Sequence, residues 1–264
     1  MTHQSVDWSE FRDIAGRPGD QIAALLDSLE QEPNAGLWRE LGRRLVVETE
    51  CFCSAGFAAL PRLSLLAEHG TEEYRDTAIK LASMIAMTLH RHHRDDDLVR
   101  AEPAALATLH RLTRSRLPSV TGSEFRDYFQ AALAFAGYVF WATISLDYSD
   151  EHYRIGCPHC STRIVVVIGD YGHYSAIRDE WAGDVQRIPL DPAEPAALDG
   201  LQRWMYDTAV ACGDPILAGG LTYLFGNATC PNCGSVFNIA EWYEAENGPT
   251  QPIDPVVPRV DRAI

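Results

Sequence analysis

The sequence predicts a mainly α-helical protein in which a domain of antiparallel helices is followed by a small β element built around four cysteines. Three observations indicate this fold class. Apolar residues recur at helical spacing along residues 1–150. After Asp147 the pattern changes, and the β-branched run RIVVVIG at 163–169 has the length and composition of a strand. Two Cys-Pro-x-Cys sequences, at 157–160 and 230–233, are spaced as in metal sites.

The first 150 residues are expected to form consecutive helices with short connections, so that neighbours in sequence pack antiparallel. Asp20 and Ser123 are the expected N-caps of the first and last helices, and Pro103 is expected at a helix start. The expected helices span residues 21–31, 37–49, 57–69, 72–92, 103–117 and 124–146.

The second half combines strand, loop and helix signals. After the strand, residues 170–198 are rich in Gly and Pro and are expected to form loops. Residues 198–213 and 214–226 predict a helical hairpin, in which Asp214 caps the second helix and Pro215 opens it. The expected organisation is a helical domain at 1–150, a β element at 151–245 with an insertion at 170–226, and a Pro-rich tail at 246–264.

An uncharged run of membrane-span length lies between Asp127 and Asp147. Its small residues, Gln130 and the acidic flanks favour a helix buried in the protein over a membrane span. The N-terminal residues have neither a basic nor an apolar stretch of a secretory signal. Cysteines in Cys-x-x-Cys pairs fit a reducing compartment, so we expect a cytoplasmic protein.

Cys157, Cys160, Cys230 and Cys233 carry the strongest chemical signal of the sequence. A Cys-x-x-Cys turn lets two thiolates reach one ion at about 2.3 Å, and four thiolates suit tetrahedral Zn²⁺ with no position left for water. We therefore expect one structural zinc ion per chain. A redox role of the two pairs is the alternative.

The turns around these cysteines are similar but not identical. Pro158 and Pro231 fix φ at the second residue of each turn, and Gly234 is expected in the left-handed conformation after the second pair. Ser161 occupies the matching place in the first turn, where we expect some strain. The arrangement resembles a zinc ribbon, which implies two such turns facing each other across the ion, with the intervening residues as an insertion.

Charge and the other polar clusters limit the possible functions. The formal charge of −15 is shared by both halves, which argues against nucleic acid and anionic membranes as ligands. The histidines and aspartates of segment 90–97 could form a site, although a polar helix end is the simpler interpretation. These residues are His90, His92, His93, Asp95, Asp96 and Asp97. The remaining cysteines, Cys51, Cys53 and Cys212, are expected in the core.

Residues 58–89 resemble a HEAT repeat. The pattern Leu60-Pro61-x-Leu63 falls where the first helix of a repeat carries its core, and Tyr74-Arg75-Asp76-x-Ala78 matches the second helix. Ala-Ala-Leu at 58–60 recurs at 104–106, an offset within the range of two-helix repeats. The resemblance implies a HEAT-like stack of helix pairs, and a plain antiparallel bundle is the alternative.

A wider resemblance covers most of the chain. The runs LWRELGRRLVVETECFCSAGFAALPRL and WMYDTAVACGDPILAGGLTYLFGNATCPNCGSVF are similar to uncharacterised HEAT-like bacterial proteins of the actinobacterial type. Some relatives resemble immunity proteins of polymorphic toxin systems, which bind and neutralise a toxin. This implies a protein-binding scaffold or adaptor, and the acidic charge favours a partner with a basic surface. An enzyme with a site at His90–Asp97 and a transcription-linked zinc ribbon are alternatives, and the partner and the oligomeric state stay open.

Overall fold

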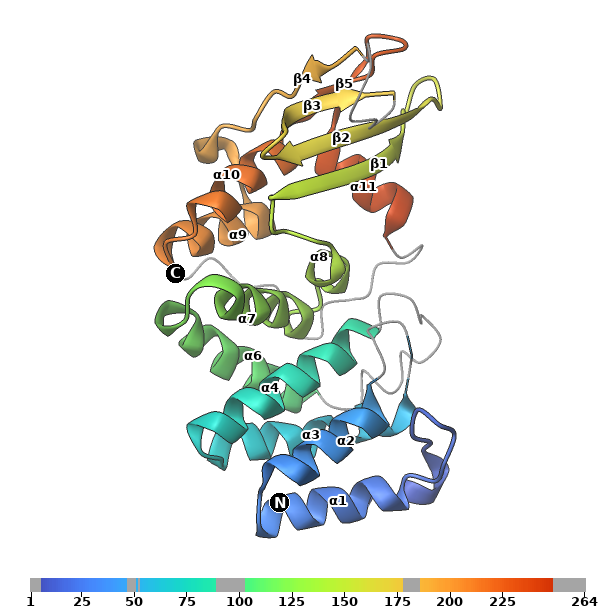
Figure 1. Cartoon of the computed structure of the whole chain (residues 1–264), viewed down its shortest axis with the longest axis vertical. Coiled ribbons are helices and arrows are strands. Elements are labelled where there is room, and N and C mark those ends of the chain that lie inside the picture. Colours follow the sequence, from blue (N-terminus) through green and yellow to red (C-terminus); the bar gives the residue numbers. More distant parts are fainter. Residues whose placement is uncertain (1–5, 47–50, 52, 89–102, 178–185, 249–264) are drawn as a thin grey trace. The chain divides into compact units, whose positions relative to one another are not determined.

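The computed structural model describes residues 6–46, 51, 53–88, 103–177 and 186–248. The chain divides into two compact units, one built mainly from residues up to Thr143 and the other from Ile144 onward (Figure 1). The protein is mainly helical, with two small antiparallel sheets in the second unit. This confirms the predicted fold class at the level of secondary structure, whereas the HEAT-like arrangement stays a prediction.

The first unit consists of helices whose apolar faces pack together. Helix α3 contacts α1, α4 and α6, and α1 also contacts α2. The apolar face of α4 is buried and includes Ala78, Leu81 and Ile85. The helices are α1 (Asp20–Gln31), α2 (Ala35–Leu45), α3 (Ser54–His69), α4 (Glu72–Met87), α6 (Pro103–Arg116), α7 (Gly122–Phe135) and α8 (Val139–Thr143), with 3₁₀ turns η1 (Trp8–Glu10) and η3 (Leu117–Ser119).

Two expected N-caps are wrong by one position. Gly19 is the N-cap of α1 and Asp20 is its first residue. A side chain at Gly19 would meet the backbone oxygen of Trp8 at 2.6 Å, so the capping position has room only for glycine. Helix α7 begins at Gly122, which places Ser123 inside the helix instead of before it.

The uncharged run after Asp127 does not form the single helix expected over 124–146. Gly137 adopts a φ of +87°, and the N–H of Tyr138 donates to the carbonyl of Leu133 at 2.9 Å while the N–H of Gly137 donates to that of Ala134 at 3.0 Å. This pair of bonds is a Schellman motif, which ends α7 and lets the chain turn before α8. No helix in the described part of the chain combines the length and apolar character of a membrane span.

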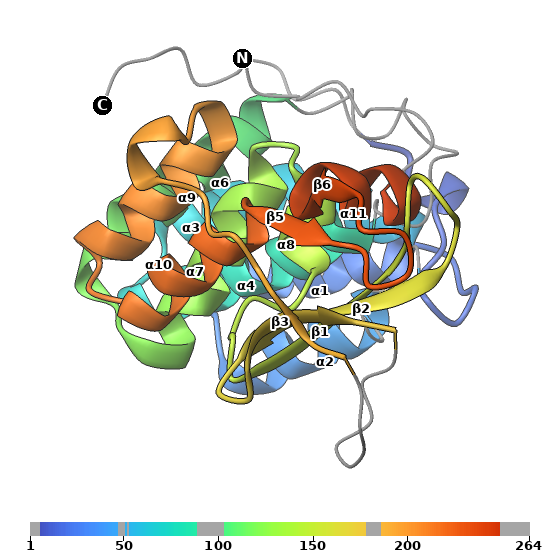
Figure 2. The same ribbon diagram turned by 90° about the horizontal axis from the view of Figure 1, so that it is seen from above.

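The second unit contains a four-stranded sheet in the order β1-β2-β3-β4 and a separate β5–β6 hairpin, and every pair is antiparallel. The predicted strand at 163–169 is confirmed as β2. Helices α10 and α11 lie on the same side of the sheet, against β2 and β1 respectively (Figure 2). The strands are β1 (Asp150–Gly156), β2 (Arg163–Gly169), β3 (Gly172–Ala176), β4 (Ile188–Pro189), β5 (Asn227–Thr229) and β6 (Val236–Asn238), and the helices are η4 (Pro195–Ala197), α9 (Gly200–Ala211), α10 (Pro215–Leu224) and α11 (Ile239–Asn247).

The helical hairpin α9–α10 is confirmed, including the cap of its second helix. Pro215 is the first residue of α10, and the carboxylate of Asp214 accepts the N–H of Leu217 at 2.9 Å. The expectation of loops throughout 170–198 is wrong. Strand β3 pairs with β2 across a tight turn in which Gly172 has a φ of +121°, and β4 then pairs with β3.

The segment between the two cysteine pairs therefore contributes strands β2, β3 and β4 to the sheet. Asp191 forms an antiparallel bridge with Asn227, which begins β5. The hydroxyl of Ser175 on β3 donates to the carbonyl of Thr229 at 2.6 Å. Since Thr229 precedes Cys230, these contacts join the four-stranded sheet directly to the second cysteine turn.

Candidate metal centre

Each cysteine pair lies in the turn of a β-hairpin. The first turn joins β1 to β2, and the second joins β5 to β6. In the first turn, the N–H of Cys157 donates to the carbonyl of Thr162, and the N–H of Ser161 donates back to the carbonyl of Cys157, both at 2.9 Å. Cys230 exchanges the same two bonds with Ser235 and Gly234, again at 2.9 Å. We call these two turns the first and second knuckle.

The expected difference between the knuckles is present in the backbone. Ser161 has a φ of +58°, and Gly234, at the matching place, has a φ of +72°. An L-residue with a side chain is disfavoured in this left-handed region because its Cβ approaches the following carbonyl oxygen. The first knuckle therefore holds a strained residue where the second has glycine.

The four sulfur atoms are close enough to share one ion. The Sγ atoms of Cys157 and Cys233 are 3.8 Å apart, and so are those of Cys160 and Cys230. All four sulfurs lie within 4.8 Å of one another. A tetrahedron with metal–sulfur bonds of about 2.3 Å has edges of about 3.8 Å. The separations therefore fit a four-sulfur metal site.

Polar side chains around the sulfurs change their affinity for protons. Asn232 donates its amide to Cys160 Sγ at 3.5 Å and to Thr162 Oγ1 at 3.0 Å, which links the two knuckles. The bonds from Asn232 and Thr162 lower the pKa of Cys160 to about 5. Hydrogen bonding to Ser235, whose hydroxyl lies 3.4 Å away, lowers the pKa of Cys233. These groups stabilise thiolates, the form in which cysteine binds metal.

The other pair of sulfurs has a less polar environment. Cys230 is buried, and this burial raises its pKa to about 11. Cys157 is also buried and accepts the backbone N–H of His159 at 3.4 Å. A cation in the centre would supply the charge that makes a buried thiolate favourable. The donor set thus fits a cation better than four protonated thiols.

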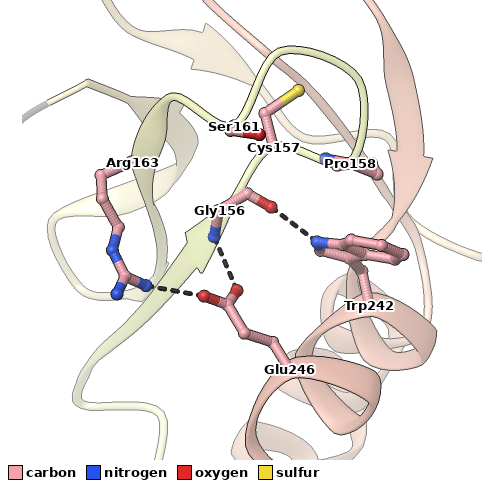
Figure 3. A pocket seen from close by; sticks show the side chains of 7 residues that line it. All are labelled: Gly156, Cys157, Pro158, Ser161, Arg163, Trp242 and Glu246. Carbon is pink, nitrogen blue, oxygen red and sulfur yellow. Dashed lines mark hydrogen bonds and ion pairs between the residues drawn. The ribbon is translucent and has the colours of Figure 1, made fainter.

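Side chains of helix α11 form hydrogen bonds with Gly156, the residue that precedes the first knuckle. Glu246 accepts the N–H of Gly156 at 2.6 Å and pairs with Arg163 at 2.7 Å, while the indole N–H of Trp242 donates to the Gly156 carbonyl at 2.5 Å (Figure 3). Because α11 follows β6 directly, it connects the second knuckle to the first. Sequence reasoning missed these residues. Their four-residue spacing, which places both on one helix face, was the available signal.

The structure does not test the other candidate residues for a metal or catalytic site. His90, His92, His93 and the Asp95–Asp97 run lie outside the described residues. Within the described residues, the four cysteines are the one group of three or more His, Cys, Asp or Glu side chains with metal-binding separations.

The remaining cysteines are only partly in the core. Cys53 is buried as expected, at the N-cap of α3, and its thiol donates to the carbonyl of Arg12 at 3.3 Å. The expectation was wrong for Cys51, which precedes α3 and is exposed. It was also wrong for Cys212, which is partly exposed because it lies at the C-cap of α9.

Comparison with protein families, with curated proteins and with solved structures finds no match to this chain.

Proposed function

We propose that this chain is a zinc-stabilised scaffold that binds a partner protein. The observation that carries the zinc assignment is the set of four sulfurs within 4.8 Å of one another. Thiolates are soft ligands, and four of them at tetrahedral separations favour Zn²⁺ over Mg²⁺ or Ca²⁺, which prefer oxygen. Such a site needs reduced thiolates, which supports a cytoplasmic location.

A four-sulfur site supports a structural role of the ion. When bound, zinc would supply a cross-link between the hairpins, and no coordination position would remain for a substrate or a water molecule. The chain's own residues orient the ligands, because Asn232 bonds across the knuckles and α11 holds Gly156 next to Cys157. Free energy of zinc binding would then add to the stability of the second unit.

Partner binding is supported by charge and by the resemblance in sequence. A net charge of −15 creates a field that attracts a basic protein and speeds its association. An immunity or adaptor protein that covers a basic toxin is the form of this function implied by the resemblance in sequence to bacterial HEAT-like proteins. Zinc would hold the scaffold rigid while its surface makes the contacts.

Metal analysis tests the zinc assignment. Protein purified without chelator is expected to contain about one zinc per chain by elemental analysis. Cys230→Ser is expected to abolish zinc binding, since it removes a ligand from the closed site. Cys212→Ser is the matched control and is expected to retain the metal. Wild-type protein free of zinc, or a Cys230→Ser variant that keeps it, would contradict the assignment.

A separate experiment tests the partner. Proteins captured by the tagged chain are purified and their affinity is titrated at increasing ionic strength. A basic partner is expected to bind more weakly as salt rises from about 50 to 300 mM, because screening reduces the attraction between opposite charges. A captured protein whose affinity does not respond to salt would contradict a charge-driven interaction.

A further inference from the structure

A surface hollow of about 410 Å³ lies beside the first knuckle, and Cys157 is among the residues that line it (Figure 3). One wall is apolar and consists of the Trp242 indole and the Pro158 ring. The other wall is polar and carries the Arg163 guanidinium and Ser161 (Figure 3). Gly156 and Glu246 form the floor between them. The hollow is thus lined by residues of the first knuckle and of α11.

The two walls are held in place by the floor. Trp242 is 36% exposed, yet its indole N–H is fixed on the Gly156 carbonyl. The Arg163 side chain is 74% exposed, and one of its terminal nitrogens is fixed on Glu246. A guanidinium has five N–H donors in a planar fork, so a second carboxylate can bind beside the first. Holding both groups in advance reduces the entropy that a ligand loses on binding.

The chemistry of the walls defines the ligand. Arginine recognises a carboxylate, whereas a tryptophan face beside a proline ring favours proline or aliphatic side chains. A short peptide with an aspartate or glutamate between apolar or proline residues presents both groups at this spacing. The volume is enough for a few residues and too small for a folded domain.

The chain itself contains such a peptide directly after α11. Residues 252–255 read Pro-Ile-Asp-Pro, and they lie outside the described residues. The six residue-to-residue steps from Gly248 to Asp254 can span about 20 Å when the chain is extended. Glu246, which contacts Arg163, is near the end of the same helix, so this reach is sufficient. Asp261, the other acidic residue of the segment, is flanked in sequence by Arg259 and Arg262 instead of by proline and isoleucine.

We propose that the hollow binds the chain's own Pro252–Pro255 stretch, with Asp254 paired to Arg163 and the flanking Ile253 and Pro255 against Trp242 and Pro158. This inference goes beyond the proposed scaffold function and does not depend on it. The bound stretch would cover the base of the first knuckle and remove Trp242 from solvent.

Hydrogen exchange of the full-length protein tests the proposal. The amides of Ile253, Asp254 and Val256 are expected to exchange about ten-fold more slowly than in a free peptide of residues 249–264. Asp254→Asn is expected to remove this protection, since it deletes the carboxylate without touching the knuckle. Asp261→Asn is the matched control and is expected to preserve it. Exchange at the free-peptide rate in the wild-type chain would overturn the proposal.

A charge exchange identifies the partner of Asp254. Arg163→Glu and Asp254→Arg are each expected to lose the protection, and the double variant is expected to recover it because the pair is re-formed with opposite polarity. Failure of the double variant to recover would rule out this pair. Protection that increases with protein concentration would show a second copy as the occupant and would likewise overturn the intrachain proposal.

Zinc content measured on the same samples separates the two proposals. Tail protection in a protein without zinc would refute the zinc assignment and leave this inference standing. A zinc-loaded protein whose tail exchanges like the free peptide would refute this inference and leave the zinc assignment standing.

Discussion

At the scale of single residues, the two knuckles differ chiefly in one backbone position. Ser161 and Gly234 both have a positive φ and both donate their N–H to the first cysteine of their pair. Space does not explain the difference, because a Cβ at Gly234 would meet nothing within 4 Å. The cost of a side chain there is therefore that of the left-handed backbone alone.

Reciprocal substitutions measure this cost. Ser161→Gly is expected to stabilise the zinc-loaded protein by about 1 kcal/mol, because glycine removes the left-handed strain but adds entropy to the unfolded chain. Gly234→Ser is expected to destabilise it by about the same amount. Denaturant unfolding of both variants checks the prediction, and shifts of equal sign would contradict it.

A second residue-scale prediction concerns His110, which is buried on α6. Burial, with a smaller effect of the Arg114 charge, lowers the pKa of His110 to about 4. Between pH 6.5 and pH 4 the unfolded chain binds a proton that the folded chain does not. Stability is therefore expected to fall through this window as the pH is lowered, by about 3 kcal/mol once both forms are protonated.

The comparison of wild type with His110→Gln isolates this effect. The difference in unfolding free energy between the two proteins is expected to narrow as pH falls from 7 to 4.5. Any effect of pH on the four cysteines is the same in both proteins and cancels in this difference. A pH-independent difference would contradict a neutral buried histidine.

At the scale of elements, the sequence prediction succeeded where a short stretch of residues carries a strong local signal, and it failed where only the backbone hydrogen bonds reveal the structure. Asp214-Pro215 and the run at 163–169 carry local signals strong enough to place α10 and β2. The break at Gly137 was missed because the apolar pattern continues across it, and only the backbone bonds of the Schellman motif reveal it. The cysteines were found because spacing alone defines a Cys-x-x-Cys turn.

Other features depend on contacts between distant residues and leave little trace in local sequence. Strand β3 pairs with β2, and Ser175 on β3 donates a hydrogen bond to Thr229. The amino-acid composition of residues 170–198 indicates neither contact. The bonds from Trp242 and Glu246 to Gly156 join residues on opposite sides of the whole insertion. Such contacts require the fold before they can be inferred.

Helix α10 provides a matched test of packing at this scale. A Cβ at Gly220 would lie 2.1 Å from the ring of Tyr148, whereas a Cβ at its neighbour Gly219 would meet nothing within 4 Å. Gly220→Ala is expected to destabilise the protein by about 2–3 kcal/mol through overpacking, and Gly219→Ala to stabilise it by about 0.5–1 kcal/mol through helix propensity. Thermal unfolding of both variants checks this, and equal effects would contradict the close packing of α10 on Tyr148.

At the scale of the whole molecule, the chain combines a helical unit with a second unit in which four cysteines that could hold a metal ion come from the turns of two hairpins. The hydrogen bonds from Asn232 and from α11 link these hairpins independently of any ion. Removal of zinc is expected to loosen the second unit more than the first.

The position of α11 also protects the sheet from unwanted association. Strand β1 is at the edge of the sheet, where exposed peptide groups invite pairing with a strand from another molecule. At Gly156 both peptide groups are already occupied, the N–H by a carboxylate and the carbonyl by an indole. A strand from another molecule would have to displace both the carboxylate and the indole before it could extend the sheet at this end. Helix α11 therefore disfavours edge-to-edge aggregation at Gly156.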